Sequence, residues 1–129
     1  MSTVFSFGSA EEMFEFMQQE AKRIRERKPT PLEAYPEEIR PVIESSAAHM
    51  KIAYDVKPNG NFKHPAKRRK AAEDQLRRLG KALDEAGGFG LMQAVYAAIE
   101  DVHPDLRNSY GCAMRCLECT WSGIGRWQG

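Results

Sequence analysis

The sequence predicts an all-α protein, a compact bundle of about four helices that forms one helical domain over residues 1–129. Three observations support this prediction. Apolar residues recur at intervals of three and four along most of the chain, as on the buried side of an amphipathic helix. Prolines and glycines interrupt this pattern where helices would connect. The 129 residues, 42% of them hydrophobic, suit a single core and leave no room for a second one.

The first helix is expected over residues 10–28. Ser9 and Glu12 have the spacing of a capping box, in which each side chain satisfies a free backbone amide at the helix start. Glutamates fill the first turns and arginines the last ones, an arrangement that the helix dipole favours. Pro29 then ends the helix, because proline cannot continue its hydrogen bonding.

The second helix is expected to begin near Pro41, after a proline-rich joint of short turns. Its end has two interpretations, because residues 51–56 also alternate as the residues of a strand do. Pro58-Asn59-Gly60 forms a turn, and residues 62–65 return either as a strand or as a loop. We therefore allow a minor two-stranded hairpin within residues 51–64.

Three further helical segments are expected, over residues 65–86, 91–102 and 106–121. Gly87-Gly88 closes the first of them, and the short joint makes it an antiparallel neighbour of the second. The second segment is apolar on nearly all sides, so we expect it to be central and largely buried. Across all segments the core is assigned to Met13, Met17, Ile24, Ile43, Met50, Leu76, Leu79, Leu83, Val95, Ile99, Leu117 and Trp121.

Charge is unevenly distributed along the chain, although the net value is only +1. The first twenty residues carry −4, whereas residues 57–81 carry nine lysines and arginines against two acids, a local excess of +7. Cations in the first turn of a helix oppose its dipole, so their presence there suits a bound phosphate or carboxylate. A solvated helix face accounts for the run equally well. Within this basic segment, residues 63–81, the candidate nucleic-acid or anion-binding residues are Lys63, His64, Lys67, Arg68, Arg69, Lys70 and Arg77.

Two groups of glutamates supply the complementary charge, one in the first helix and one around the proline-rich joint. A solubilising surface is the ordinary role of such residues. They also suit contact with a basic protein partner, or imitation of a nucleic acid. The candidate acidic partner surface consists of Glu11, Glu12, Glu15, Glu33, Glu37 and Glu38.

The three cysteines lie close together near the C-terminus, and their odd number suits a reducing cytoplasm. On a helix, Cys112, Cys116 and Cys119 share one stripe, where two thiolates and His49 or His103 would bind a soft metal. Packing of the thiols as small apolar groups explains the same spacing, and we favour that interpretation. We therefore expect no cofactor and keep the cysteines as the alternative metal site.

No enzyme motif is present: the sequence has no nucleophile elbow, P-loop, dinucleotide fingerprint or zinc-protease helix. We therefore expect no catalytic residues. No apolar stretch is long enough to cross a bilayer and no secretory signal is visible. These observations predict a cytoplasmic protein without a membrane partner, whose oligomeric state stays open.

The tail from Trp121 to Trp127 places two tryptophans around Gly123 and Gly125, and at least one indole should pack within the chain. This tail resembles small accessory proteins of bacterial phages and mobile elements. Together with the segregated charge, the resemblance implies a non-catalytic binding protein, such as an inhibitor of a host protein or nucleoprotein complex. Direct nucleic-acid binding by the basic segment and a small metal-binding module are the alternatives.

Overall fold

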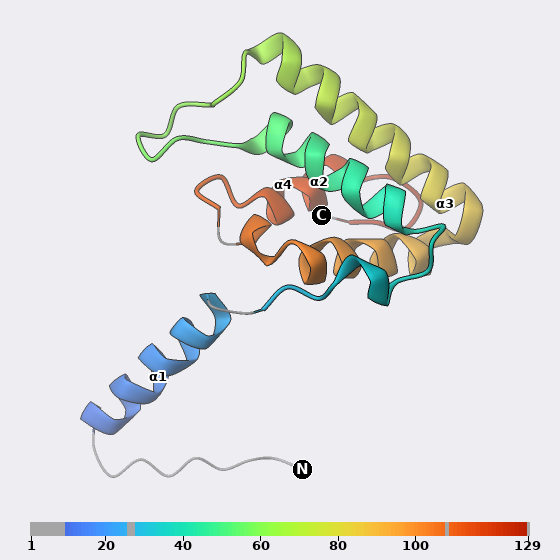
Figure 1. Cartoon of the computed structure of the whole chain (residues 1–129). Helices are drawn as coiled ribbons and strands as arrows, with labels where there is room; N and C mark the ends of the chain where they lie inside the picture. Colours follow the sequence, from blue (N-terminus) through green and yellow to red (C-terminus); the bar gives the residue numbers. More distant parts are fainter. Residues whose placement is uncertain (1–9, 26–27, 108, 129) are drawn as a thin grey trace.

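The computed structural model describes residues 10–25, 28–107 and 109–128, and within the first range the side chains of residues 10–19. The fold is all-α, as predicted (Figure 1). Among the described helices, none combines the length and the apolar character needed to cross a bilayer. The elements are α1 (Ala10–Arg25), η1 (Leu32–Ala34), α2 (Arg40–Tyr54), α3 (Ala66–Val102), η2 (Pro104–Leu106) and α4 (Ala113–Trp121), of which η1 and η2 are 3-10 helices.

α3 consists of two helical segments that meet at Gly88. The backbone there has a φ of 71°, a left-handed conformation that glycine adopts without strain, and the helical dihedrals are interrupted. Figure 1 shows the chain reversing direction at this bend, and α2 packs against α3. The expected end of the first segment at Gly87-Gly88 is thus confirmed.

The core is built from α2, both segments of α3, α4 and the C-terminal tail. Apolar residues at helical spacing turn inward from each of these elements, which removes their side chains from water and stabilises the fold. One predicted member, Leu79, is only half-buried. The predicted core residues that the structure shows as buried are Ile43, Met50, Leu76, Leu83, Val95, Ile99, Leu117 and Trp121.

The prediction that α1 contributes to the core is wrong for its described side chains. Met13 and Met17 are 43% and 62% exposed, and the neighbouring Phe14 is 61% exposed. Figure 1 shows α1 leading away from the bundle of α2, α3 and α4, so its apolar stripe has no core to face. The side chain of Ile24 lies outside the described residues.

The connection between α2 and α3 is a loop with a single bridge in place of the two-stranded hairpin. α2 continues to Tyr54, so the helical interpretation of its end is correct. Val56 and Phe62 then form one isolated antiparallel bridge across the turn at Gly60, and no strand is assigned among the described residues.

The last helix begins later than predicted. Pro104 starts η2 and the chain turns after it, so regular α-helix is delayed until Ala113. Cys112 has a φ of 47°, a left-handed conformation that an α-helix of L-residues does not continue through. Cys112 therefore precedes the helix that carries Cys116 and Cys119, and the three cysteines do not share one helical stripe.

Both tryptophans of the tail pack inside the molecule. Trp121 is fully buried, and its Nε1–H donates to the carbonyl oxygen of Leu76 at 2.9 Å. Trp127 is 7% exposed, and its Nε1–H donates to the carbonyl oxygen of Glu118 at 3.0 Å. Gly123, with a φ of 86°, turns the chain after α4, and the two indoles meet edge to face with their centroids 5.2 Å apart.

Candidate functional site

The first segment of α3 carries a basic stripe along its outer face. The stripe consists of Lys67, Lys70, Arg78 and Lys81, all of them exposed. Their spacings of three, eight and three residues place them on one side of the helix, opposite the buried Leu76. Asp74 lies between them, and its carboxylate is 3.7 Å from the Nζ of Lys70, the stripe's single ion pair among the described residues.

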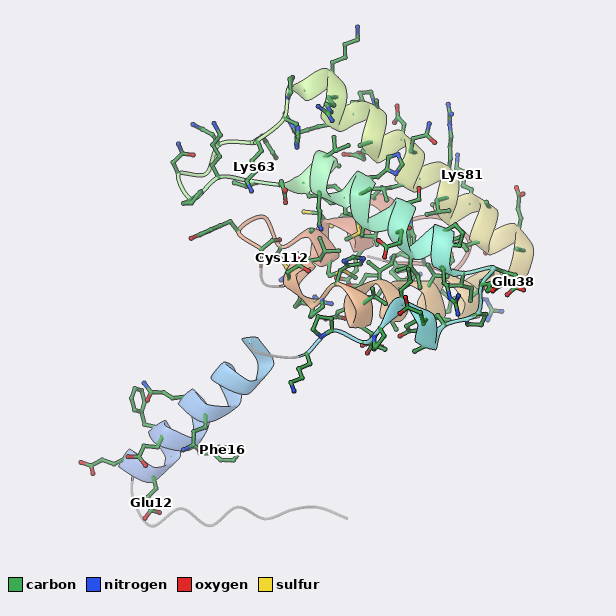
Figure 2. All side chains as sticks on the ribbon, in the orientation of Figure 1. Glu12, Phe16, Glu38, Lys63, Lys81 and Cys112 are labelled. Carbon is green, nitrogen blue, oxygen red and sulfur yellow. The ribbon has the colours of Figure 1, made fainter. Side chains whose placement is uncertain are left out.

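Of the stripe, Lys67 and Lys70 were among the predicted candidates, whereas Arg78 and Lys81 were not. Predicted residues outside the stripe lie around the start of α3, apart from Arg77. Figure 2 shows Lys63 in the loop that precedes the helix, and its Nζ is 3.9 Å from the carboxylate of Asp55. His64 is half-buried, whereas Arg68 is exposed. The side chain of Arg68 projects about 100° around the helix axis from that of Lys67, so it faces a different side of α3.

Two arginines of the basic segment have clear roles in the fold. The guanidinium carbon of Arg69 is 3.6 Å from the centroid of the Phe62 ring, and its Nε donates to the carbonyl oxygen of His64 at 3.2 Å. Arg77 donates from Nη1 to the carbonyl oxygen of Thr120 at 2.7 Å, and so satisfies the C-terminal end of α4. The packing of the loop and of α4 accounts for these two side chains.

The predicted acidic surface is divided between distant parts of the molecule. All six glutamates are exposed: three lie on α1, Glu33 lies in η1, and Glu37 and Glu38 lie between η1 and α2. Figure 2 shows Glu12 and Glu38 at opposite ends of the molecule. The structure therefore brings the basic stripe together on one helix face, but it does not join the two glutamate groups into one surface.

The cysteine thiols make local contacts with the backbone. Cys112 Sγ donates to the carbonyl oxygen of Arg107 at 3.6 Å, and Cys116 Sγ donates to that of Gly111 at 3.3 Å. Burial raises the pKa of the Cys116 thiol, and the neighbouring Cys112 and Cys119 raise it further. Cys116 is therefore held as a neutral thiol, a poor nucleophile and a poor metal ligand.

The histidines considered as metal ligands bind other groups. His49 Nδ1–H donates to the carbonyl oxygen of Ser45 at 2.7 Å, one turn earlier in α2. His103 Nε2 lies 3.2 Å from a carboxylate oxygen of Glu44. In the described part of the chain, no group of three or more His, Cys, Asp or Glu side chains has the arrangement of a metal site.

A groove of about 480 Å³ lies between the end of α2, the first turns of α3 and α4. Cys116, Cys119 and Phe62 contribute to its lining. Tyr54 also lines it; its hydroxyl hydrogen bonds to the hydroxyl of Thr120, and burial raises the pKa of Tyr54. With a neutral phenol and a neutral thiol, the groove holds no activated base or nucleophile among these groups.

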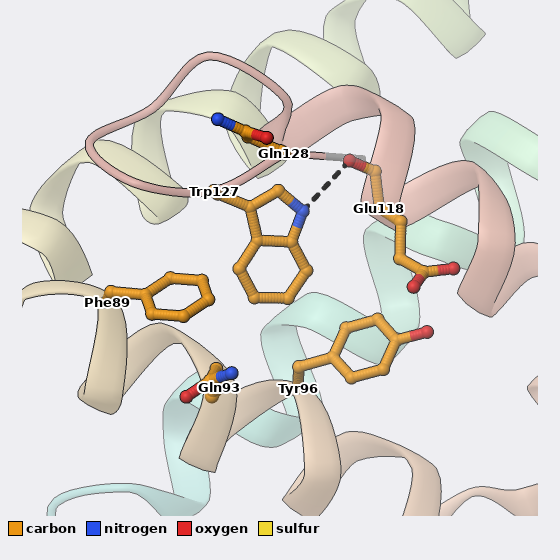
Figure 3. Close-up of a pocket in the computed structure, with 6 residues that line it drawn as sticks. All are labelled: Phe89, Gln93, Tyr96, Glu118, Trp127 and Gln128. Carbon is orange, nitrogen blue, oxygen red and sulfur yellow. Dashed lines mark hydrogen bonds between the residues drawn. The ribbon is translucent and has the colours of Figure 1, made fainter.

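The structure contains a second pocket that the sequence did not predict (Figure 3). Phe89 and Tyr96 reach it from α3, Glu118 from α4 and Trp127 from the tail. The first two are seven residues apart and so share a helix face, a signal that the sequence does contain. The contribution of Trp127 depends on how the tail folds back, which no local pattern indicates.

Comparisons of this chain with protein-family models, with curated proteins and with solved structures find no match.

Proposed function

We propose that this chain is a non-catalytic binding protein that contacts the phosphate backbone of a nucleic acid through the basic stripe. The observation that carries the proposal is the arrangement of Lys67, Lys70, Arg78 and Lys81 on one exposed helix face. From Lys67 to Lys81 the stripe extends over about 21 Å of helix, at 1.5 Å per residue, and so spans several successive phosphates.

The stripe is a poor arrangement for stability alone. Like charges three or four residues apart repel one another by about 0.2–0.5 kcal/mol per pair. The first turn of α3 also contains no acidic residue, and Pro65 at its N-cap makes no side-chain capping bond. A polyanion bound along the face reverses this repulsion, because each phosphate neutralises a cation and releases counterions.

Backbone contact, without sequence readout, is the mode that the stripe supports. Lysine binds phosphate as a point charge and three of the four cations are lysines, whereas base recognition relies on the planar groups of Arg, Asn and Gln. An inhibitor of a host nucleoprotein complex, the role suggested by the C-terminal tail, would use such a stripe to compete for phosphates.

The test measures the binding of a short fluorescent DNA duplex by fluorescence anisotropy, at several salt concentrations. With about four phosphates contacted, the logarithm of the affinity should fall with the logarithm of salt at a slope of about −3.6. Affinity should therefore drop roughly a hundredfold between about 50 and 200 mM salt. A variant that changes all four stripe residues to glutamate should lose this binding and keep the circular dichroism spectrum of the folded helical protein.

The matched control reverses charge at exposed cations elsewhere, in a Lys51→Glu, Arg115→Glu and Arg126→Glu triple variant. This control should retain most of the affinity, because α2, α4 and the tail carry its substitutions. The proposal is wrong if no duplex binds at low salt, or if the control loses as much affinity as the stripe variant.

A second candidate function is self-association through α1, favoured by its exposed apolar side chains. Met13, Phe14 and Met17 lie on one face of a 16-residue helix that leads away from the bundle. Glu11 and Glu12 lie in its first turn, and by sequence its last turns are basic. Two copies side by side and antiparallel would therefore bury the apolar face and pair acidic with basic ends.

Sedimentation equilibrium tests this candidate directly. The wild-type chain should form a dimer whose dissociation constant rises with salt, since part of the attraction is between charges. A Phe14→Glu, Met17→Glu variant should be monomeric. A wild-type chain that stays monomeric at high protein concentration would show that α1 does not pair with its own copy.

A further inference from the structure

The pocket between α3, α4 and the C-terminal tail combines aromatic rings with one carboxylate (Figure 3). Its volume of about 360 Å³ is in the range of roughly 300–1,000 Å³ that small-ligand sites occupy. No residue of the basic stripe lines it, so the site is independent of the nucleic-acid proposal. Its lining is Phe89, Gln93, Tyr96, Glu118, Trp127 and Gln128.

The aromatic walls are inclined to one another. The rings of Phe89 and Trp127 have centroids 5.8 Å apart and planes at 68°. Those of Tyr96 and Trp127 are 5.4 Å apart with planes at 52°. In the edge-to-face contact of Phe89 and Trp127, the edge of one ring covers part of the other's face, so a cation in the pocket would contact the ring faces that stay open to it.

Hydrogen bonds hold two of these rings in place before any ligand arrives. The indole of Trp127 donates to the carbonyl oxygen of Glu118 at 3.0 Å. The hydroxyl of Tyr96 donates to the carbonyl oxygen of Met114 at 3.3 Å. A site whose walls are already ordered loses less side-chain entropy on binding.

Glu118 is the only charged residue in the lining. In the described part of the chain its carboxylate has neither an ion pair nor a hydrogen bond, since only its backbone carbonyl is engaged. The cation that contacts Tyr96 is Arg107, whose Nη2 is 2.9 Å from the Tyr96 hydroxyl. Arg107 is already paired, with its Nε 2.8 Å from a carboxylate oxygen of Glu100, so Glu118 stays uncompensated.

We propose that this pocket binds an alkylated ammonium group, as found in choline or in a methylated lysine side chain. Aromatic faces attract cations, and alkylation makes an ammonium group easier to remove from water. The carboxylate of Glu118 adds a direct attraction that an uncharged ligand would not gain. The amides of Gln93 and Gln128 lie on either side of the rings in Figure 3 and complete a polar rim.

Titration of the full chain with choline, at constant ionic strength, tests the proposal. The readout is the pair of indole N–H signals in two-dimensional NMR, where Trp127 lines the pocket and Trp121 does not. Choline should shift the Trp127 signal in a saturable way. The uncharged isostere, in which carbon replaces nitrogen, should bind roughly threefold to thirtyfold more weakly. A trimethyl-lysine derivative in the same assay shows whether a protein side chain is the better source of the group.

Two conservative variants separate the contributions of charge and ring. Glu118→Gln should weaken choline binding about twofold to fivefold, while it keeps the backbone carbonyl that orients Trp127. Phe89→Leu keeps an apolar side chain but should weaken binding roughly threefold to thirtyfold. Glu37→Gln, which removes an exposed carboxylate outside the pocket, should leave the affinity unchanged.

The unshifted Trp121 indole signal identifies variants that remain folded, because its N–H donates to the carbonyl of Leu76 inside the core. Equal affinity for choline and its uncharged isostere would overturn the proposal and show an apolar pocket only. Choline that leaves the Trp127 signal unmoved would overturn it as well.

Discussion

Gly80 offers a direct test of the packing between α3 and the C-terminal tail. A Cβ at this position would lie 2.7 Å from both Cδ1 and Nε1 of Trp121, and 3.0 Å from Cδ1 of Ile124. Carbon atoms in ordinary contact are about 3.5–4.0 Å apart, so the Gly80→Ala methyl overlaps the indole by close to 1 Å. Trp121 has little freedom to move away, because it is fully buried and its indole N–H donates a hydrogen bond to the carbonyl oxygen of Leu76.

The magnitude follows from three opposing contributions. Overpacking of a filled core costs about 1–3 kcal/mol. Displacement of the indole weakens its hydrogen bond to Leu76, which is about 1 kcal/mol more. Alanine is a better helix former than glycine by about 1 kcal/mol, and this gain offsets part of the cost. Gly80→Ala should therefore lower the free energy of unfolding by about 1–3 kcal/mol.

The measurement is urea unfolding followed by circular dichroism, with tryptophan emission as a second signal. Gly90→Ala is the matched control, since the same change in the second segment of α3 meets nothing within 4 Å. It should leave stability unchanged or raise it by up to about 1 kcal/mol. If Gly80→Ala were as stable as Gly90→Ala, with unaltered emission, the close packing of Trp121 on Gly80 would be refuted.

Three further predictions concern single side chains. Arg77→Met should lower stability by about 1 kcal/mol, because methionine keeps an apolar stem but loses the Nη1 donor to the carbonyl oxygen of Thr120. Arg78→Met, at an exposed position, should not, and urea midpoints compare the two variants. Cys119, which is exposed, should be alkylated before Cys116, whose thiol pKa is raised by burial; mass spectrometry after a short reaction shows the order. Burial raises the pKa of Tyr96 from its ordinary value of 10.0 to about 12, so the unfolded chain loses the proton first. Stability should therefore fall as pH rises from about 10 to 12, and less steeply in Tyr96→Phe.

The helices of the bundle could be predicted because their apolar periodicity reports burial directly. Ile43 and Met50 in α2, and Leu76 and Leu83 in α3, recur at helical spacing and are all buried. The same rule failed for Met13 and its neighbours in α1, because periodicity shows that a helix has an apolar face but not what covers that face. The late start of α4 depends on the backbone at Cys112, where the side chain gives no local signal for a left-handed conformation.

For the candidate sites too, features set by local spacing could be predicted, and features that depend on tertiary contacts could not. The basic stripe could be predicted in part, since charge and helical spacing can both be determined from the sequence. The prediction did not separate Arg69 and Arg77, whose partners Phe62 and Thr120 come from other elements. The aromatic pocket depends on three separate elements meeting, so only the spacing of Phe89 and Tyr96 was visible in advance.

The stability of the first segment of α3 comes from its inner side, and this explains how its outer face carries so much unpaired charge. Leu76 is buried and accepts the hydrogen bond of Trp121, while Arg77 holds the end of α4. None of these contacts uses a residue of the basic stripe, so charge on the stripe can change at little cost to the core. A face kept only for solubility would gain stability from acids in its first turn, where the helix dipole favours them by about 0.3–1 kcal/mol each. The cation at Lys67, in the first turn, forgoes that gain, and an anionic partner is the physical reason that we propose for it.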